Sequence, residues 1–247
     1  MWHDPQMEID EFLAALDRDS AAFADACAAA GPGAEVAGCP GWTVADLLWH
    51  LTEVQDFWRT IVAEKRASWE GYKEPQRPSD DGLIDLYMAG RTRLLDALGE
   101  ADPATPVWTW SQDKTAGFVI RRMAHETAVH LWDANAAAGT TAPIDATLAS
   151  DGIDEFLTHM LAGVAKGAAP VGGSVHLHCG DVPGEWTVTE AGDGFTVVRE
   201  HAKGDCAIRG TANDILLALW RRLPLSELDV VGDRDVAERF IAHTGND

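Results

Sequence analysis

The chain of 247 residues is 46% hydrophobic and 24% charged, a globular composition with room for one large domain or two small ones. A formal net charge of −21 argues against nucleic-acid partners unless a basic patch offsets it, and Arg121-Arg122 and Arg221-Arg222 are pairs and not patches. No apolar stretch reaches the ~18 residues of a membrane span and the first residues carry no secretory signal, so we expect a cytoplasmic protein without a membrane partner.

The first half of the sequence shows the apolar spacing of α-helices. Four predicted helices, separated by segments that contain glycine or proline, cover residues 8–30, 43–68, 80–99 and 117–138. Thr43 and Asp46 stand three residues apart, and this spacing predicts a capping box at the start of the second helix. Residues 1–142 are therefore expected to form a four-helix bundle.

The second half begins with a predicted linking helix over residues 144–166 and then changes to a period of two. Short alternating segments, separated by turns that contain glycine, predict strands at residues 174–179, 185–190, 195–200 and 205–209. A helix, a short segment and a last helix follow at residues 211–222, 230–233 and 234–243. The sequence thus predicts an α+β protein, with a helical bundle over residues 1–142 and a linking helix and small α+β domain over residues 143–247.

Four widely separated cysteines, Cys27, Cys39, Cys179 and Cys206, form no Cys-x-x-Cys pair. In a chain without a signal peptide, this spacing favours free thiols over a disulfide framework and disfavours a thiolate metal site. Cys179 and Cys206 are expected to be small core residues.

The second predicted helix offers one candidate metal ligand. On a helical wheel, His50 lies in the middle of an apolar stripe with Leu47 and Leu51, so its imidazole should point into the bundle. For a single histidine in this position, a hydrogen-bonded core residue is the stronger interpretation.

The fourth predicted helix adds a carboxylate and a second imidazole. Glu126, His130 and Asp133 share one helical face at spacings i, i+4 and i+7. An inward carboxylate needs a cation, a metal or a shifted pKa, and one divalent ion would satisfy Glu126, His130 and an opposing His50 together. Asp133 is expected to orient an imidazole rather than to bind the ion. From spacing alone, a solvated polar face explains these residues equally well.

Two further histidine pairs are weaker candidates for a metal site. His125 and His130 are five residues apart and do not share a helical face, so they do not form a His-Glu-x-x-His motif. His176 and His178 share one face of a predicted strand, but the sequence shows no obvious third ligand near them.

The segments around the candidate ligands resemble a known family. Residues 40–51 (PGWTVADLLWHL) and 122–134 (RMAHETAVHLWDA) are similar to the two signature segments of the mycothiol-dependent maleylpyruvate isomerase family, which belongs to the DinB-like metal-binding bundles. Similarity at residues 148–157, 219–222 and 231–233 extends the resemblance over nearly the whole chain. The resemblance implies a zinc-type site with one open position and with the ligands His50, Glu126 and His130.

Two nitrogen ligands, one oxygen ligand and an open position are typical of catalytic zinc, although such a site also accepts nickel or iron. A coordinated thiol, with mycothiol as the implied cosubstrate, would lose its proton and attack a small electrophile in an S-transfer or a thiol-assisted isomerisation. Arg222 is our candidate for contact with an acidic or carbonyl-bearing substrate, and a solvated helix end explains it equally well. A metal-dependent hydrolase and a non-enzymatic regulatory module stay open as alternatives.

Overall fold

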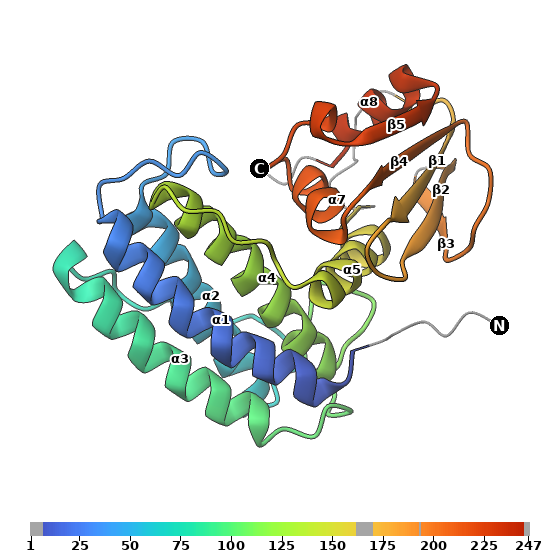
Figure 1. The fold of residues 1–247 in the computed structure, drawn as a ribbon. Coiled ribbons are helices and arrows are strands. Elements are labelled where there is room, and N and C mark those ends of the chain that lie inside the picture. The colour runs from blue at the N-terminus through green and yellow to red at the C-terminus, as the bar shows by residue number, and fades with distance from the viewer. Residues whose placement is uncertain (1–6, 162–169, 193, 245–247) are drawn as a thin grey trace. The chain divides into compact units, whose positions relative to one another are not determined.

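A computed structural model describes residues 7–161, 170–192 and 194–244 of the chain. The chain divides into two compact units, one of Glu8–Ala142 and the other containing Pro143–Asp247. The first unit is helical and the second holds a sheet with helices, so the predicted α+β class is confirmed (Figure 1). None of the described helices is both long and apolar enough to cross a membrane.

The N-terminal unit is a bundle in which α1 packs along α4 and α2 packs along α3 (Figure 1). Its helices begin close to their predicted starts and comprise α1 (Ile9–Ala30), α2 (Val44–Ala63), α3 (Leu83–Gly99) and α4 (Ala116–Ala137). A single 3₁₀ turn, Asp80–Gly82, leads into α3, and the segment between α3 and α4 is irregular.

The second helix ends earlier than the predicted residue 68. Lys65 adopts a left-handed backbone with φ 48°, and the N–H of Arg66 donates to the carbonyl of Ile61. This bond closes the last turn in the manner of a Schellman motif, although a lysine stands where glycine is usual. No glycine or proline stands between Ala63 and Gly71, so the sequence carries no terminator at the turn where the helix stops.

The start of α2 is held by the predicted capping box. The Thr43 hydroxyl accepts the N–H of Asp46, and the Asp46 carboxylate accepts the N–H of Thr43. The N–H of Thr43, the guanidinium of Arg77 and the hydroxyl of Thr43 all donate to the Asp46 carboxylate and lower its pKa to about 2. The first turn of α2 is therefore fixed by local polar contacts before any packing is considered.

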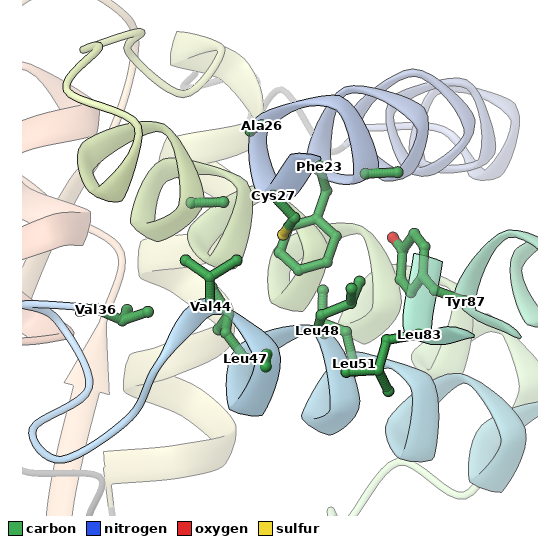
Figure 2. Close-up of a cluster of buried hydrophobic side chains, with 13 residues drawn as sticks. Phe23, Ala26, Cys27, Val36, Val44, Leu47, Leu48, Leu51, Leu83 and Tyr87 are labelled. Atoms are coloured by element: carbon green, nitrogen blue, oxygen red, sulfur yellow. The ribbon is translucent and has the colours of Figure 1, made fainter. Parts of the chain in front are cut away.

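The bundle core fixes the rotation of α2. Figure 2 shows Leu47 and Leu51 of α2 in one buried cluster with Phe23 of α1 and Tyr87 of α3. Leu47, Leu51, Phe23 and Tyr87 are fully buried. Burial of Leu47 and Leu51 fixes the rotation of this turn of α2. His50, which lies between the two leucines, is therefore held at the edge of the buried face of the helix.

The C-terminal unit begins with α5 (Ala146–Glu155), which continues as a π-helical segment, Phe156–Met160. The end of the predicted linking helix, residues 162–166, lies outside the described residues. A five-stranded sheet follows with the order β3-β2-β1-β4-β5, in which β1 and β4 are parallel and the other neighbours are antiparallel. Its strands, close to their predicted positions, are β1 (Ser174–Cys179), β2 (Glu185–Ala191), β3 (Gly194–Val198), β4 (Cys206–Gly210) and β5 (Asp229–Gly232).

Two helices, α7 (Ala212–Leu219) and α8 (Arg234–Ala242), pack on this sheet, and a 3₁₀ turn, Leu225–Glu227, precedes β5. Val175 and Leu177 of β1 are buried, and they alternate with His176 and His178. Because successive strand side chains point to opposite faces, the two histidines lie on the other face of the sheet.

The predicted free thiols are confirmed. The structure contains no disulfide among its four cysteines, all of which lie in described segments. Cys179 and Cys206 are buried core residues, as expected from their sequence context.

Replacing Thr43 with alanine should lower the free energy of unfolding by about 1 kcal/mol, because α2 loses its cap. Urea denaturation followed by circular dichroism measures the change. Thr92→Ala, at an exposed position inside α3, is the matched control and should shift stability by less than about 0.5 kcal/mol. An equal loss in both variants would contradict the role of the cap.

Candidate metal centre

Three side chains from α2 and α4 meet at one point. His50 Nε2 lies 3.0 Å from Glu126 Oε1, and His130 Nε2 lies 3.3 Å from the same oxygen. The two imidazole rings are nearly perpendicular, with centroids 5.1 Å apart. One ligand atom from each residue lies within 4.8 Å of the other two. The structure thus brings together the three residues that the sequence selected as metal ligands.

The cluster lies at the rim of the bundle rather than deep in its core. The exposed fractions of the side chains are 32% for His50, 15% for Glu126 and 5% for His130. His50 also packs against Trp42, with ring centroids 5.1 Å apart. The apolar stripe of α2 is wider than its buried face, so His50 points less far inward than its place in the stripe suggested. The cluster is therefore partly open to solvent on the side of His50.

Asp133 orients the imidazole of His130, as predicted. Its Oδ2 lies 2.9 Å from His130 Nδ1, and both residues are buried. A carboxylate beside Nδ1 keeps a hydrogen on that nitrogen, so Nε2, which faces Glu126, is the nitrogen that can exchange its proton for a cation. This arrangement prepares Nε2 to bind a cation.

Cys39 is a polar neighbour that the sequence analysis missed. Its Sγ lies 3.7 Å from Asp133 Oδ2, and atoms of Cys39, His130 and Asp133 form a second group within 4.8 Å of one another. Cys39 comes from the loop before α2, whose path depends on tertiary packing. No second cysteine stands close to Cys39 in the sequence, so no metal-binding motif pointed to this residue.

Arg122 is a second residue that the sequence analysis did not place. It is buried, and its Nη2 donates to Glu126 Oε2 at a distance of 3.0 Å. The spacing of four residues between Arg122 and Glu126 on α4 is the signal that could have identified this pair. Arg122 therefore binds one carboxylate oxygen of Glu126, and the other oxygen faces the two histidines.

The electrostatics of the cluster favour charged side chains despite burial. Burial opposes ionisation of Glu126, but hydrogen bonds from His130 and His50 and the charge of Arg122 outweigh it and hold its pKa well below the usual value. Burial likewise opposes a charged His130, but its hydrogen bond with Asp133 and its other polar contacts raise its pKa well above the usual value. A cation bound between these groups would replace the proton of His130.

The other candidate residues, His125 and Arg222, make contacts of their own. The ring of His125 packs edge-on against Phe12 with centroids 5.7 Å apart, which agrees with the expectation that it points elsewhere. Arg222 belongs to the C-terminal unit, where its Nη1 donates to the carbonyl of Trp220 at 2.8 Å. Its guanidinium also lies 5.6 Å from the centroid of the Trp220 ring. The catalytic role of Arg222 stays a prediction.

One expectation about the paired strand histidines is wrong. The sequence showed no third ligand near His176 and His178, but the structure places Glu185 and His201 beside them. Glu185 lies on the neighbouring strand, and His201 lies in a connection whose path the sequence does not reveal.

Fold and site together define a class of α+β protein in which a helical bundle carries a His-Glu-His cluster and a small sheet domain follows. Residues 13–135 match the mycothiol maleylpyruvate isomerase N-terminal domain, and residues 147–239 match the C-terminal domain of the same enzyme. The chain belongs to the mycothiol-dependent maleylpyruvate isomerase family and is homologous to an enzyme.

Two solved structures have a similar fold. They are crystal structures of the mycothiol-dependent maleylpyruvate isomerase and of a histidine-to-alanine mutant of it, with TM-scores of 0.57 and 0.56. Each is 13% identical to this chain, and the match covers 88% of this chain and 91% of the other. The comparison with curated protein sequences gave no match.

Glu126→Gln should lower the unfolding free energy of the metal-free protein by about 1–3 kcal/mol near pH 6, because the cluster loses its shared carboxylate. A depressed glutamate pKa stabilises the fold above the unfolded value of about 4.3, so the difference from wild type should shrink as the pH falls below it. The raised pKa of His130 adds stability that is full below about 6.5 and is lost as the pH rises through its folded value.

Urea titrations at several pH values, in the presence of a chelator, measure this dependence. Glu64→Gln, at an exposed ion pair with Arg66, is the control and should change stability little at any pH. If the difference in unfolding free energy between wild type and Glu126→Gln stayed constant from pH 6 to below about pH 4.3, Glu126 would not be ionised in the fold as described.

Proposed function

We propose that the bundle binds one zinc-type divalent ion through His50, Glu126 and His130 and uses mycothiol to isomerise a small substrate. The substrate class is a cis alkene conjugated to a carbonyl group, of which maleylpyruvate is the first candidate. The observation that carries the proposal is the meeting of two imidazole nitrogens and one carboxylate oxygen within 4.8 Å, in a member of this family. A cytoplasmic location and the absence of nucleic-acid partners remain predictions from the sequence.

The donor set fits such an ion. Two imidazoles and one carboxylate match the three-ligand sites of catalytic zinc, which keep a position open for water or substrate. The partial exposure of His50 leaves a route to that position. Zinc bound there would lower the pKa of a coordinated thiol, so that the thiol binds as its thiolate.

The remaining residues of the cluster hold these donors in place. Asp133 keeps the Nδ1 hydrogen of His130 directed toward its own carboxylate, and Arg122 holds one oxygen of Glu126. Both contacts limit rotation of the donor groups, Arg122 favours the ionised form of Glu126, and Asp133 leaves His130 Nε2 as the nitrogen that would bind the ion. The chain need not supply its own nucleophile, because the thiol supplies one.

The proposed reaction is reversible addition of the thiolate. A bond forms between sulfur and an alkene carbon as the π bond breaks, and its electron pair moves onto the conjugated carbonyl oxygen. Rotation about the new single bond and return of the electron pair expel the thiolate and give the trans alkene. No oxidant or reductant is consumed, and the thiol is regenerated. Transfer of the thiol to an electrophile with a leaving group would begin with the same attack.

We include Arg222 as the residue that binds an anionic part of the substrate. In an acidic chain, an arginine is the side chain best suited to hold a carboxylate through two hydrogen bonds. The contacts of its guanidinium with Trp220 limit the freedom of the side chain. These contacts support a defined orientation of the charge.

His50→Ala should lower kcat/KM for mycothiol-dependent isomerisation of maleylpyruvate on the order of 100-fold or more, because one donor is lost. An absorbance assay of wild type, before and after removal and readdition of zinc, gives the matching metal dependence. Glu64→Gln serves as the control and should keep full activity. Wild-type activity that survives metal removal, or an active His50→Ala variant, would contradict the proposal.

The cobalt-substituted protein separates this function from hydrolysis. Mycothiol should change the visible spectrum of the bound cobalt, since the thiol enters the open position. A spectrum that responds to ester substrates and not to the thiol would favour a hydrolase.

Arg222→Gln should raise KM for the substrate roughly 10-fold or more and leave the bound metal unchanged, because a charged hydrogen bond to the substrate is lost. Steady-state kinetics and metal analysis measure the two effects. Arg234→Gln, at an exposed arginine paired with Glu238, is the control. An unchanged KM in Arg222→Gln would remove this residue from the site.

A further inference from the structure

A second group of potential metal ligands lies in the C-terminal unit. His176 and His178 come from β1, and Glu185 stands at the start of β2. His201 comes from the connection between β3 and β4. The sheet register places His178 directly opposite Glu185, on the face of β1 that does not carry Val175 and Leu177.

All three imidazoles contact the same carboxylate. Glu185 Oε2 lies 2.9 Å from His176 Nε2 and 2.5 Å from His201 Nδ1. Glu185 Oε1 lies 3.2 Å from His178 Nδ1. One ligand atom from each of the four residues lies within 4.8 Å of the others. Four donors from three segments of the chain therefore converge on one point.

The spacing of these donors is close to that of a metal site. Zinc–nitrogen bonds of ~2.0–2.1 Å in a tetrahedron place ligand atoms about 3.3 Å apart. The contacts of Glu185 are slightly shorter than this, and small rotations of the side chains would open room for an ion. His176 and Glu185 are largely buried, with 5% and 11% of their side chains exposed. His201 is 67% exposed, so an ion can enter from its side.

The connection between β3 and β4, which carries His201, crosses two strands of the sheet. In the sheet order, β2 and β1 lie between β3 and β4, so residues 199–205 must cross both strands to connect β3 with β4. The end of this crossing is anchored where the carboxylate of Asp205 accepts the N–H of Ser174 at 2.7 Å. His201 reaches Glu185 from the first part of the same crossing.

We propose that His176, His178, Glu185 and His201 bind a divalent transition-metal ion of the zinc class, separate from the candidate centre in the bundle. Three imidazole nitrogens select zinc and its neighbours over calcium and magnesium, which prefer oxygen ligands. Four protein ligands form a closed site, which is typical of structural rather than catalytic zinc. The ion fastens the crossing segment to the two strands beneath it.

Cobalt titration of the full chain in a His50→Ala background tests the site, because that variant lacks a donor of the bundle cluster. The His50→Ala protein should bind one cobalt ion with the visible spectrum of a four-coordinate site. Adding Glu185→Gln should weaken this binding roughly 10-fold or more, since the negatively charged donor is lost. Glu200→Gln, at an exposed neighbouring carboxylate, is the matched control and should bind as the His50→Ala protein does.

Trypsin cleavage at Lys203, an exposed residue of the crossing, gives a second measurement, made without the His50→Ala substitution. Zinc should slow this cleavage in the wild type and have no effect in Glu185→Gln. Equal cobalt affinity with and without Glu185→Gln, or cleavage that zinc does not slow in the wild type, would overturn the proposal. Because both measurements read the C-terminal unit, their failure leaves the proposed function of the bundle untouched.

Discussion

The candidate centre depends on the carboxylate of Glu126, which joins α2 to α4. One of its oxygens accepts from Arg122, and the other contacts both His50 and His130. Burying a carboxylate costs several kcal/mol unless cationic or hydrogen-bonding partners compensate. Arg122 and His130 belong to the same helix as Glu126, and His50 belongs to α2. The residues of α4 therefore stabilise the charge, and α2 adds the third donor.

The two histidines differ in burial and in what holds them. His130 is enclosed on α4 and has its tautomer set by Asp133, so it is a rigid donor. His50 lies at the rim and is held mainly by the rotation of α2, which the buried pair Leu47 and Leu51 fixes. A centre built from one enclosed and one accessible imidazole can bind an ion firmly and still admit a second molecule.

Helical periodicity predicted the bundle and put His50, Glu126 and His130 on faces where one ion could join them, and the family resemblance implied that they are the ligands. Each of these residues lies on a helix, where spacing determines direction. The same reasoning could not place Cys39, because its contact with Asp133 depends on the path of a loop. Arg122 and Glu126 stand four residues apart on α4, so helical spacing permits their contact, but spacing alone does not select it. Periodicity also missed the end of α2 at Ala63, where the backbone of Lys65 turns.

In the C-terminal unit, alternation predicted the strands but not their order. The grouping of His176, Glu185 and His201 requires the sheet order β3-β2-β1-β4-β5, which makes the connection after β3 cross β1 and β2. No local pattern encodes that crossing, since it is a property of non-local strand pairing. The sequence therefore showed only two possible ligands, His176 and His178, and the fold adds Glu185 and His201.

A crystal structure of the zinc-loaded protein, with anomalous differences recorded at the zinc absorption edge, tests the central claim most directly. The account predicts an anomalous peak in the bundle, within bonding distance of His50 Nε2, His130 Nε2 and a Glu126 oxygen. A bundle without such a peak, or a peak bound instead by Cys39, His130 and Asp133, would contradict it.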